Sequence, residues 1–211
     1  MRTYDDPCGI ARALDHVGER WALLIVRELL LGPKRFTDLR AGLPSASPNV
    51  LSQRLRELEE SGVLRRHRLP PPYASQVYEL TERGLELEPA VLALARWGSR
   101  MPMPSTGSLS VDALVVALRT TFDAEAARGF EARVELRVGL DRFLAEVAAG
   151  GLTLVRGVAG RVDAVLEADA DRLRGLAFMG AALDGEGVRV EGDREAVRRF
   201  LTLFPRPAMS S

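Results

Sequence analysis

The sequence predicts an α+β protein in two parts: a mostly helical N-terminal unit that ends in a β-hairpin, and a C-terminal unit in which an antiparallel sheet packs against helices. Three observations lead to this prediction. Residues 98–110, "GSRMPMPSTGSLS", lack any apolar period and are typical of a linker within the 211 residues. Before this stretch, apolar side chains recur at helical spacing. After it, segments with strand alternation mix with amphipathic helices. We expect domains at residues 1–100 and 111–211, joined by a linker at 101–110.

Composition and charge narrow the classes of function. The chain is 46% hydrophobic and 27% charged, as in an ordinary globular protein, and its net charge is zero. Nucleic-acid binding would therefore need a local basic patch, because no overall positive field supports it. No apolar run approaches the roughly 20 residues of a membrane span, and the first residues show no export signal. One cysteine and two histidines argue against a structural metal site. We expect a cytoplasmic protein without a membrane partner, metal or cofactor.

Three helices open the N-terminal unit. The first, at residues 8–18, carries its apolar side chains on one face: Ile10, Ala13, Leu14 and Val17. Residues 20–32 are apolar nearly all round, which predicts a buried central helix that Gly32 and Pro33 bring to an end. Residues 35–44 predict a short third helix.

The next helix has a marked start and stop. Ser47 is a good N-cap, Pro48 suits the first helical position, and Gly62 can take the left-handed conformation that ends a helix. An apolar stripe at helical spacing predicts the buried face: Leu51, Leu55 and Leu58. The opposite face carries amides and guanidinium groups, which can read adenine and guanine edges. A lone helix of this kind would be only a solvated surface. In its setting we predict base contacts from Ser47, Asn49, Ser52, Gln53 and Arg56.

A basic hairpin follows this helix. The segments "VLRRHRL" and "SQVYELT" are β-like, and the prolines of "PPPYA" between them mark the tip. Helix, short helix, capped helix and basic hairpin, in that order, describe a winged helix-turn-helix. We predict contacts to the DNA backbone from seven residues: Lys34, Arg35, Arg54, Arg65, Arg66, His67 and Arg68. The alternative for the basic run is a charged edge strand that prevents aggregation.

A last helix is predicted to close the N-terminal unit. Thr81 can cap it, and Pro89 predicts a bend or a break within it. Its apolar side chains exceed what one small core requires, which predicts a dimer seam formed by Leu85, Val91, Leu92, Leu94, Ala95 and Trp97.

Residues 7–98 closely resemble the HxlR-type bacterial transcriptional regulators. Two blocks carry the resemblance, W-x-L-L-I-x-R-x-L-x-x-G-P-x-R-F from Trp21 to Phe36 and L-S-x-R-L-x-E-L-E-x-x-G from Leu51 to Gly62. The resemblance implies a dimeric winged-helix protein with its recognition helix at residues 47–61 and a dimer made by the terminal helices. One strand departs from the family, because Gln76-Val77-Tyr78 stands where Val-Glu-Tyr is common.

Cys8 lies just before the first helix, near the expected dimer interface. Some relatives in the resembled family sense electrophiles or oxidants through a cysteine at this end, which makes Cys8 a candidate sensor. A helix N-terminus can also lower the pKa of a thiol. The alternative is that Cys8 serves as a small buried apolar side chain.

The C-terminal unit alternates strands and helices. "VDALVVALRTTFDAEA" and "ADRLRGLAFMG" predict helices, and three segments between residues 130 and 169 predict strands, with a hairpin turn at Gly150-Gly151. The ending "VRVEGDREAVRRFLTLF" predicts a strand, a turn at Gly192-Asp193 and a helix. This arrangement resembles the sterol-carrier-protein-like fold, which implies an apolar tunnel for lipids or acyl chains. Its candidate lining is Phe143, Leu173, Leu176, Phe178, Met179, Leu183, Phe200, Leu203 and Phe204. The alternative is that these side chains form a filled core.

The sequence supports two candidate functions. The first is a dimeric transcriptional regulator that binds a pseudo-palindromic site in double-stranded DNA, with a small hydrophobic ligand as a candidate effector. The second is a lipid- or acyl-chain-binding protein whose N-terminal unit serves mainly for dimerisation. An enzyme is not expected, because the chain has no G-x-S-x-G motif, no Walker loop and no H-E-x-x-H motif.

Overall fold

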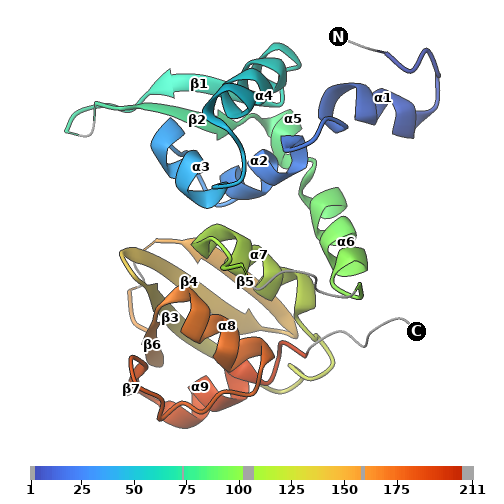
Figure 1. The fold of residues 1–211 in the computed structure, drawn as a ribbon. Helices are drawn as coiled ribbons and strands as arrows, with labels where there is room; N and C mark the ends of the chain where they lie inside the picture. The colour runs from blue at the N-terminus through green and yellow to red at the C-terminus, as the bar shows by residue number, and fades with distance from the viewer. Residues whose placement is uncertain (1–2, 73, 102–106, 158–159, 206–211) are drawn as a thin grey trace. The chain divides into compact units, whose positions relative to one another are not determined.

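The computed structural model describes residues 3–72, 74–101, 107–157 and 160–205 (Figure 1). The chain divides into two compact units, Met1–Val91 and Leu92–Ser211. The first is helical with a hairpin and the second holds a larger sheet, so the predicted α+β class is confirmed. Residues 102–106 of the predicted linker lie outside the described residues, and the linker at 101–110 stays a prediction.

The N-terminal unit has the predicted order of elements. Its helices are α1 (Gly9–Val17), α2 (Ala22–Leu29), α3 (Phe36–Gly42) and α4 (Pro48–Glu60), followed by the strands β1 (Leu64–Arg68) and β2 (Gln76–Leu80) and then α5 (Glu82–Leu85) and α6 (Glu88–Gly98). Helix α6 crosses the boundary between the two units. The core of the N-terminal unit combines side chains from α2, α3 and α4 with side chains from the hairpin, among them Ile25, Leu29, Leu39, Leu51, Leu55, Leu58, Leu64 and Val77.

The hairpin forms where the sequence predicts it. Strands β1 and β2 pair antiparallel, with Leu64 opposite Leu80 and Arg68 opposite Gln76, so the proline segment lies in the connecting loop. Lys34 extends this sheet by an isolated bridge to Tyr78, whose backbone N–H and C=O both bond to the Lys34 backbone. The bridge ties the hairpin to the segment between α2 and α3.

The predicted break at Pro89 is confirmed. Helix α5 ends at Leu85, and α6 starts at Glu88 with Pro89 as its second residue. Proline removes a backbone donor and its ring clashes with the carbonyl four residues earlier, here that of Leu85, so the helix cannot continue through it. Thr81 caps α5 as predicted, because its Oγ1 accepts a hydrogen bond from the Gly84 backbone N–H at 3.1 Å.

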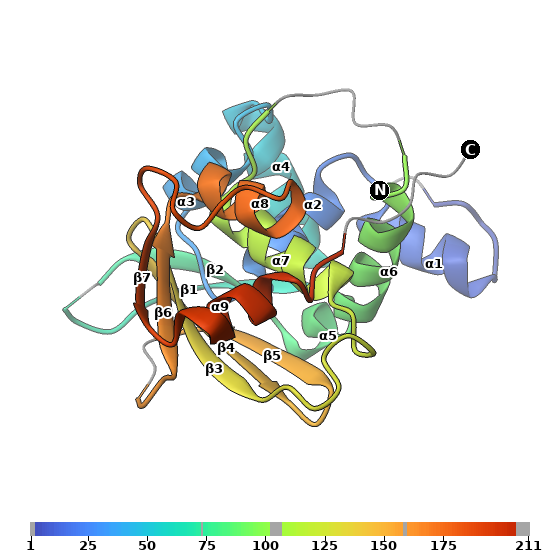
Figure 2. The same cartoon turned by 90° about the horizontal axis from the view of Figure 1, so that it is seen from below.

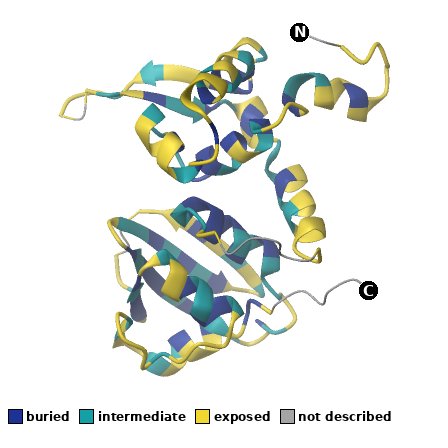
Figure 3. Ribbon diagram, viewed as in Figure 1, coloured by how far each residue is buried: buried dark blue, intermediate teal, exposed yellow. Residues whose placement is uncertain are grey.

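Helices α1 and α6 leave apolar side chains in solvent (Figure 3). On α1 the predicted apolar face is largely uncovered, since only Val17 is buried while Ile10 is 72% exposed. Leu85 at the end of α5 and Leu94 and Trp97 on α6 are exposed, whereas Val91 of α6 is buried. An apolar face that one chain leaves in solvent is typical of a surface that another chain covers.

The C-terminal unit is built on a five-stranded mixed sheet. Its strands are β3 (Ala132–Val138), β4 (Asp141–Ala148), β5 (Gly151–Arg156), β6 (Ala164–Ala168) and β7 (Arg189–Gly192), in the order β5-β4-β3-β6-β7. The prediction of an antiparallel sheet was wrong at one place, because β3 and β6 run parallel while the other three pairs are antiparallel. Alternating side chains identify a strand, but they do not identify its neighbour in the sheet.

Three helices cover one face of this sheet: α7 (Val111–Thr121), α8 (Ala170–Phe178) and α9 (Arg194–Leu201) (Figures 1 and 2). The strand residues on that face are apolar and buried, among them Val134, Leu136, Phe143, Ala145 and Leu166. They meet helix side chains such as Leu114 and Phe200 in one core.

The opposite face of the sheet carries paired charges. Arg137 Nε lies 2.9 Å from Glu135 Oε1 on its own strand, and Arg133 Nε lies 3.5 Å from Glu146 Oε2 on β4. Arg142 of β4 also approaches Glu135, at 3.9 Å. The hydrogen bond that Arg137 donates to the Glu135 carboxylate raises the pKa of Arg137 above its ordinary value. This face is therefore neutralised by its own side chains.

The turn between β4 and β5 lies one residue before the predicted position. Ala148 pairs with Gly151, so Ala149 and Gly150 form the two-residue turn instead of Gly150 and Gly151. Both turn residues have positive φ, +50° and +75°, as a type I′ turn requires. Glycine was predicted at both turn positions, but the strand pairing instead imposes the left-handed conformation on Ala149. The second predicted turn is confirmed in outline: β7 ends at Gly192, and Asp193 caps α9.

Candidate nucleic-acid interface

Helix α4 presents the polar face on which the sequence predicts base contacts. Ser47 caps the helix, because its Oγ accepts a hydrogen bond from the Val50 backbone N–H at 3.4 Å, and Pro48 is the first helical residue. Gly62 follows the helix with φ +72°, as predicted. The predicted apolar stripe is buried: Leu51, Leu55 and Leu58. The opposite side is exposed and carries Asn49, Gln53 and Arg56, with Ser52 half-buried beside them.

The polar side chains of α4 bond to one another. Gln53 Nε2 donates to Glu57 Oε1 at 2.7 Å, and an Arg56 guanidinium N–H donates to Gln53 Oε1, also at 2.7 Å. Arg54 donates to the second oxygen of Glu57 and lies 3.6 Å from Glu19 in the loop before α2. Sequence reasoning missed Glu57. Its spacing of four residues after Gln53 and three after Arg54 could have indicated it, because such residues are neighbours on a helix surface.

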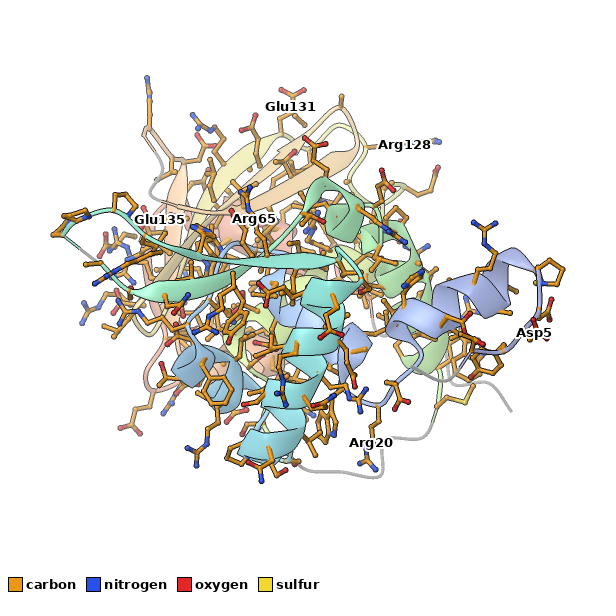
Figure 4. The ribbon with its side chains drawn as sticks, turned by 90° about the horizontal axis from the view of Figure 1, so that it is seen from above. Asp5, Arg20, Arg65, Arg128, Glu131 and Glu135 are labelled. Carbon is orange, nitrogen blue, oxygen red and sulfur yellow. The ribbon has the colours of Figure 1, made fainter. Side chains whose placement is uncertain are left out.

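The hairpin lies beside α4, as Figure 4 shows with Arg65 labelled on it. Arg65 and His67 project on one face of the hairpin and share one carboxylate. The Arg65 guanidinium donates to Glu79 Oε2 at 2.6 Å, and His67 Nε2 lies 3.0 Å from the same oxygen. Half of the predicted basic run therefore faces an acid on the neighbouring strand.

The other face of the hairpin carries Arg66 and Arg68. Arg66 donates to Gln76 Oε1 at 2.8 Å, and its guanidinium carbon lies 5.8 Å from the centre of the Tyr78 ring. Arg68 Nε donates to the backbone oxygen of Ala74 at 3.0 Å. Both side chains are exposed, and their contacts are with neutral groups. The run "RRHR" thus divides between two faces, as the two-residue period of a strand requires.

Lys34 points into the N-terminal unit. Its Nζ donates to Glu28 Oε2 at 2.9 Å, and only 13% of its side chain is exposed. Glu28 is fully buried, and its other oxygen accepts from Arg27 at 2.8 Å. A Cβ atom at Gly42 would stand 2.3 Å from the Glu28 carboxylate, so a larger residue there would require that carboxylate to move. Sequence reasoning missed this buried cluster, although a single acid inside "WALLIVRELLLG" was its signal.

Arg35 joins the third helix to the hairpin loop. Its backbone N–H donates to Asp38 Oδ2 at 2.9 Å at the start of α3, and its Nε donates to the Ser75 hydroxyl at 3.0 Å. Unlike the exposed Arg35, Arg65, Arg66 and Arg68, Lys34 has its cation paired with a fully buried carboxylate.

Cys8 occupies the N-cap position of α1 and is exposed. The backbone N–H groups of Ala11 and then Ile10 lower the pKa of the Cys8 thiol below its ordinary value. The alternative of a small buried side chain is therefore wrong for the single chain.

The nine candidate lining residues of the C-terminal unit mostly form packed core. Six are buried: Phe143, Leu173, Leu176, Phe200, Leu203 and Phe204. The rings of Phe200 and Phe204 meet edge to face at 5.0 Å. Phe178 and Leu183 are half-buried, and Met179 is 66% exposed. Two clefts of about 670 and 330 Å³ lie in this unit, and none of the nine residues lines either of them.

A polar cluster joins α7 to the sheet, and the sequence did not indicate it. Asp112 in the first turn of α7 is buried and accepts from Arg156 of β5 at 2.8 Å. Arg156 also pairs with Asp141 and covers the Phe143 ring, 4.7 Å from its centre. Burial of the guanidinium opposes its charge, but the carboxylates of Asp112 and Asp141 together raise the pKa of Arg156.

Within the described ranges, no three or more His, Cys, Asp or Glu side chains come together as metal ligands would. The helices in those ranges include none with the length and apolar character to cross a bilayer.

Comparisons with known proteins agree with the fold of the N-terminal unit. A family model described as HxlR-like helix-turn-helix matches residues 16–106. The HTH-type transcriptional regulator YvaP of Bacillus subtilis is 39% identical over 94 residues, which cover 44% of this chain and 87% of YvaP. Rv3095 of Mycobacterium tuberculosis, another HTH-type transcriptional regulator, is 43% identical over 100 residues, or 45% of this chain and 60% of Rv3095.

Among solved structures, the reduced form of the transcriptional regulator YodB from B. subtilis is 32% identical, with a TM-score of 0.41, and covers 47% of this chain and 99% of YodB. The family match ends before the C-terminal sheet begins. The identity to YvaP extends over most of that regulator. The chain therefore belongs, through its N-terminal unit, to the HxlR-like helix-turn-helix family of transcriptional regulators.

Proposed function

We propose that this protein is a dimeric transcriptional regulator that binds a specific sequence in double-stranded DNA. One observation carries the proposal: the exposed face of α4 holds Asn49, Gln53 and Arg56 beside a basic hairpin. The regulators among its relatives support the same class of function. In this proposal α4 enters the major groove, where Gln53 and Asn49 suit adenine and Arg56 suits guanine.

The cations around α4 supply contacts to the DNA backbone. Arg66 and Arg68 contact neutral groups on one hairpin face, so phosphates can engage them without breaking an ion pair. Arg65 and His67 must instead exchange the Glu79 carboxylate for a phosphate. Arg35, at the start of α3, and Arg54, on α4 itself, are further candidates for phosphate contacts. Lys34 serves the interface indirectly, because its ammonium holds Glu28 while its backbone holds the hairpin.

The dimer would be formed by the apolar faces of α1 and α6. Ile10, Leu94 and Trp97 are exposed in one chain, and their burial against a second copy would supply association free energy. Two recognition helices would then reach half-sites about 34–36 Å apart on one side of the duplex, which makes the expected operator a pseudo-palindrome.

Cys8 is proposed as a sensor of electrophiles or oxidants. The proposal rests on an exposed thiol whose pKa the N-terminus of α1 lowers, since the thiolate is the reactive form. Its position on α1 links its modification to the proposed dimer face.

The C-terminal unit is proposed to have a sterol-carrier-like fold and to take a small hydrophobic ligand. Phe178, Met179 and Leu183 are the members of the candidate lining that solvent reaches, so a ligand would enter beside them, at the end of α8. Native mass spectrometry of the purified protein tests this proposal. A bound apolar species that is lost in a Phe178→Asp variant supports it, and a bare chain after incubation with fatty acids of several lengths opposes it.

The regulator proposal is tested by selection from a pool of random DNA duplexes, followed by titration of the enriched and a scrambled duplex. We expect one enriched motif with two-fold symmetry, and binding that weakens as salt rises. Equal affinity for the enriched and scrambled duplexes would reject sequence-specific binding. Light scattering on the free protein is expected to show twice the mass of one chain.

A further inference from the structure

The proposed role of α4 in DNA binding does not explain one acidic residue on its polar side. Glu57 lies on the polar side of the proposed recognition helix, where a negative charge repels phosphates and lowers affinity for any DNA. Its carboxylate nonetheless accepts from two of the side chains proposed to meet DNA, Gln53 and Arg54. We propose that Glu57 is a positioning residue that fixes the side-chain amide of Gln53 and thereby sets base preference at the position Gln53 contacts. This inference rests on the proposed function.

The two ends of the Gln53 amide have partners of opposite kinds. Glu57 offers a carboxylate, which can only accept, and Arg56 offers a guanidinium, which can only donate. The amide therefore places Nε2 toward Glu57 and Oε1 toward Arg56, at 2.7 Å each. A flipped amide would set two donors against each other at one end and two acceptors at the other. The chemistry of its neighbours thus selects one orientation.

This orientation matters for reading a base. An amide recognises adenine by donating to N7 and accepting from the N6 amino group, so the order of donor and acceptor must match the base edge. Each amide end has capacity beyond its partner on α4, because Nε2 carries two hydrogens and Oε1 two lone pairs. Gln53 can therefore contact a base while its partners hold it.

Glu57 is itself anchored by a second part of the unit. Arg54 bonds to the Glu57 oxygen that Gln53 does not use, and the same guanidinium lies 3.6 Å from Glu19, which precedes α2. Only 27% of the Glu57 side chain is exposed. Gln53 is thereby positioned by groups outside its own helix, as a base-reading side chain requires.

The inference predicts that affinity and discrimination move in opposite directions. Replacing Glu57 by alanine removes a charge that repels phosphates, so binding to every duplex should tighten. It also frees the Gln53 amide, so preference at the base pair that Gln53 contacts should fall, by about tenfold. A residue with a merely structural role would weaken all binding and leave the ratio between duplexes unchanged.

The experiment starts from the motif that the full-length wild-type protein enriches from random duplexes. Loss of preference in Gln53→Ala identifies the base pair that Gln53 contacts. Glu57→Ala, Glu57→Gln and the control Glu60→Ala are then titrated against the motif and against the three duplexes changed at that base pair. Glu60 is exposed on the same helix, so its replacement removes the same charge. Circular dichroism checks that each variant folds, and alanine and glutamine are both good helix formers.

We expect Glu57→Ala to lose about tenfold in discrimination at this base pair and Glu60→Ala to lose none. Glu57→Gln keeps an acceptor oxygen for Gln53 and should retain more of the preference than Glu57→Ala. In a Gln53→Ala background, Glu57→Ala should reduce discrimination no further. The inference is overturned if Glu57→Ala keeps the wild-type ratios, or if Glu60→Ala lowers them equally. A wild-type protein that enriches no motif would contradict the proposed function on which the inference rests. A wild-type protein that enriches a motif, together with wild-type ratios in Glu57→Ala, would contradict the inference alone.

Discussion

Glu28 places a carboxylate in the apolar interior of the N-terminal unit, where each oxygen pairs with a cation. Arg27 lies 2.8 Å from one oxygen and Lys34 lies 2.9 Å from the other. Removing one member of a buried ionic cluster is costly, because the remaining charges lose their partners in a poorly solvated place. A side chain at position 42 would displace this carboxylate, because a Cβ atom there would lie 2.3 Å from its oxygen.

We expect Glu28→Ala to lower the free energy of unfolding by about 3 kcal/mol. Urea denaturation followed by circular dichroism measures the change. Glu60→Ala, on the exposed end of α4, is the matched control and should change stability by less than about 0.5 kcal/mol. Equal stabilities of the two variants would show that the buried cluster contributes nothing net.

The thiol of Cys8 should react with alkylating agents at lower pH than an ordinary thiol. Backbone N–H groups at the start of α1 lower its pKa, so the thiolate fraction at neutral pH is larger in the folded chain. The rate of iodoacetamide modification against pH is expected to show its midpoint below that of the same chain in urea, where α1 is absent. Coinciding midpoints would contradict an influence of the helix.

At the scale of elements, the split of the basic run between two hairpin faces separates the roles of its residues. Arg66 contacts Gln76 and Tyr78, both neutral, whereas Arg65 is engaged by Glu79. The alternation that produces this split was predictable, but the partner of each arginine depends on the register between β1 and β2. That register follows from the length of the proline loop, which sequence patterns do not determine.

Arg66→Ala should weaken binding to all duplexes by a similar factor and reduce the salt slope by about one unit. Gln53→Ala should instead change the preferred sequence and leave the salt slope unchanged. Titrations of both variants at several salt concentrations, on enriched and scrambled duplexes, distinguish these effects. Equal losses on both duplexes for Gln53→Ala would remove Gln53 from base recognition.

The stability of helix α8 should depend on pH, because Asp169 caps its N-terminus. Its side chain caps α8 by accepting from the Arg172 backbone N–H at 2.8 Å, and this bond is the main reason that the pKa of Asp169 is lowered. A lowered folded pKa stabilises the fold above the unfolded value of 3.8, and the gain is lost as pH falls through the folded pKa.

We expect Asp169→Ala to cost about 1 kcal/mol at neutral pH, as loss of an N-cap does. The difference from the wild-type protein should shrink once pH falls below 3.8. Urea denaturation at pH 7, 5 and 3 measures it. A difference that stays constant across this range would show that the carboxylate charge plays no part.

The ends of these helices could be predicted from the sequence because the residues that mark them act locally. Ser47, Pro48 and Gly62 mark the ends of α4 by their own backbone preferences, and Pro89 breaks its helix for the same reason. The candidate base-reading face followed from helical period alone. The contacts that hold this face did not, because Glu57 and Glu19 act through side-chain geometry that only the packed unit defines.

For the whole molecule, the least predictable features are those that join distant segments. Strand β6 pairs parallel with β3, whereas the pairs β3–β4 and β4–β5, formed by strands consecutive in sequence, are antiparallel. The nine apolar residues proposed to line a cavity show the same limit, since composition does not distinguish a filled core from a hollow one. Six of them are buried within the C-terminal unit.

The proposed dimer is the feature of the whole molecule that a single change can test. Leu94→Lys places a charge on the exposed apolar face of α6 and should give a monomer in light scattering. Affinity for the two-fold motif should fall by about a hundredfold, because the second half-site no longer binds as part of one assembly. Leu140→Lys is the control, on a fully exposed hairpin tip of the C-terminal unit. A dimer that survives Leu94→Lys would place the interface elsewhere.

The paired charges on the outer face of the C-terminal sheet have a consequence for the speed of association. Because Arg133, Arg137 and Arg142 each lie near a glutamate, that face adds little to the electric field around the protein. In the proposed function, the attraction of a duplex would then come from the cations near α4, and at physiological ionic strength it would fade beyond about 8 Å. Because the net charge is zero, we expect the proposed encounter with DNA to occur largely by undirected diffusion, with electrostatic capture only at short range.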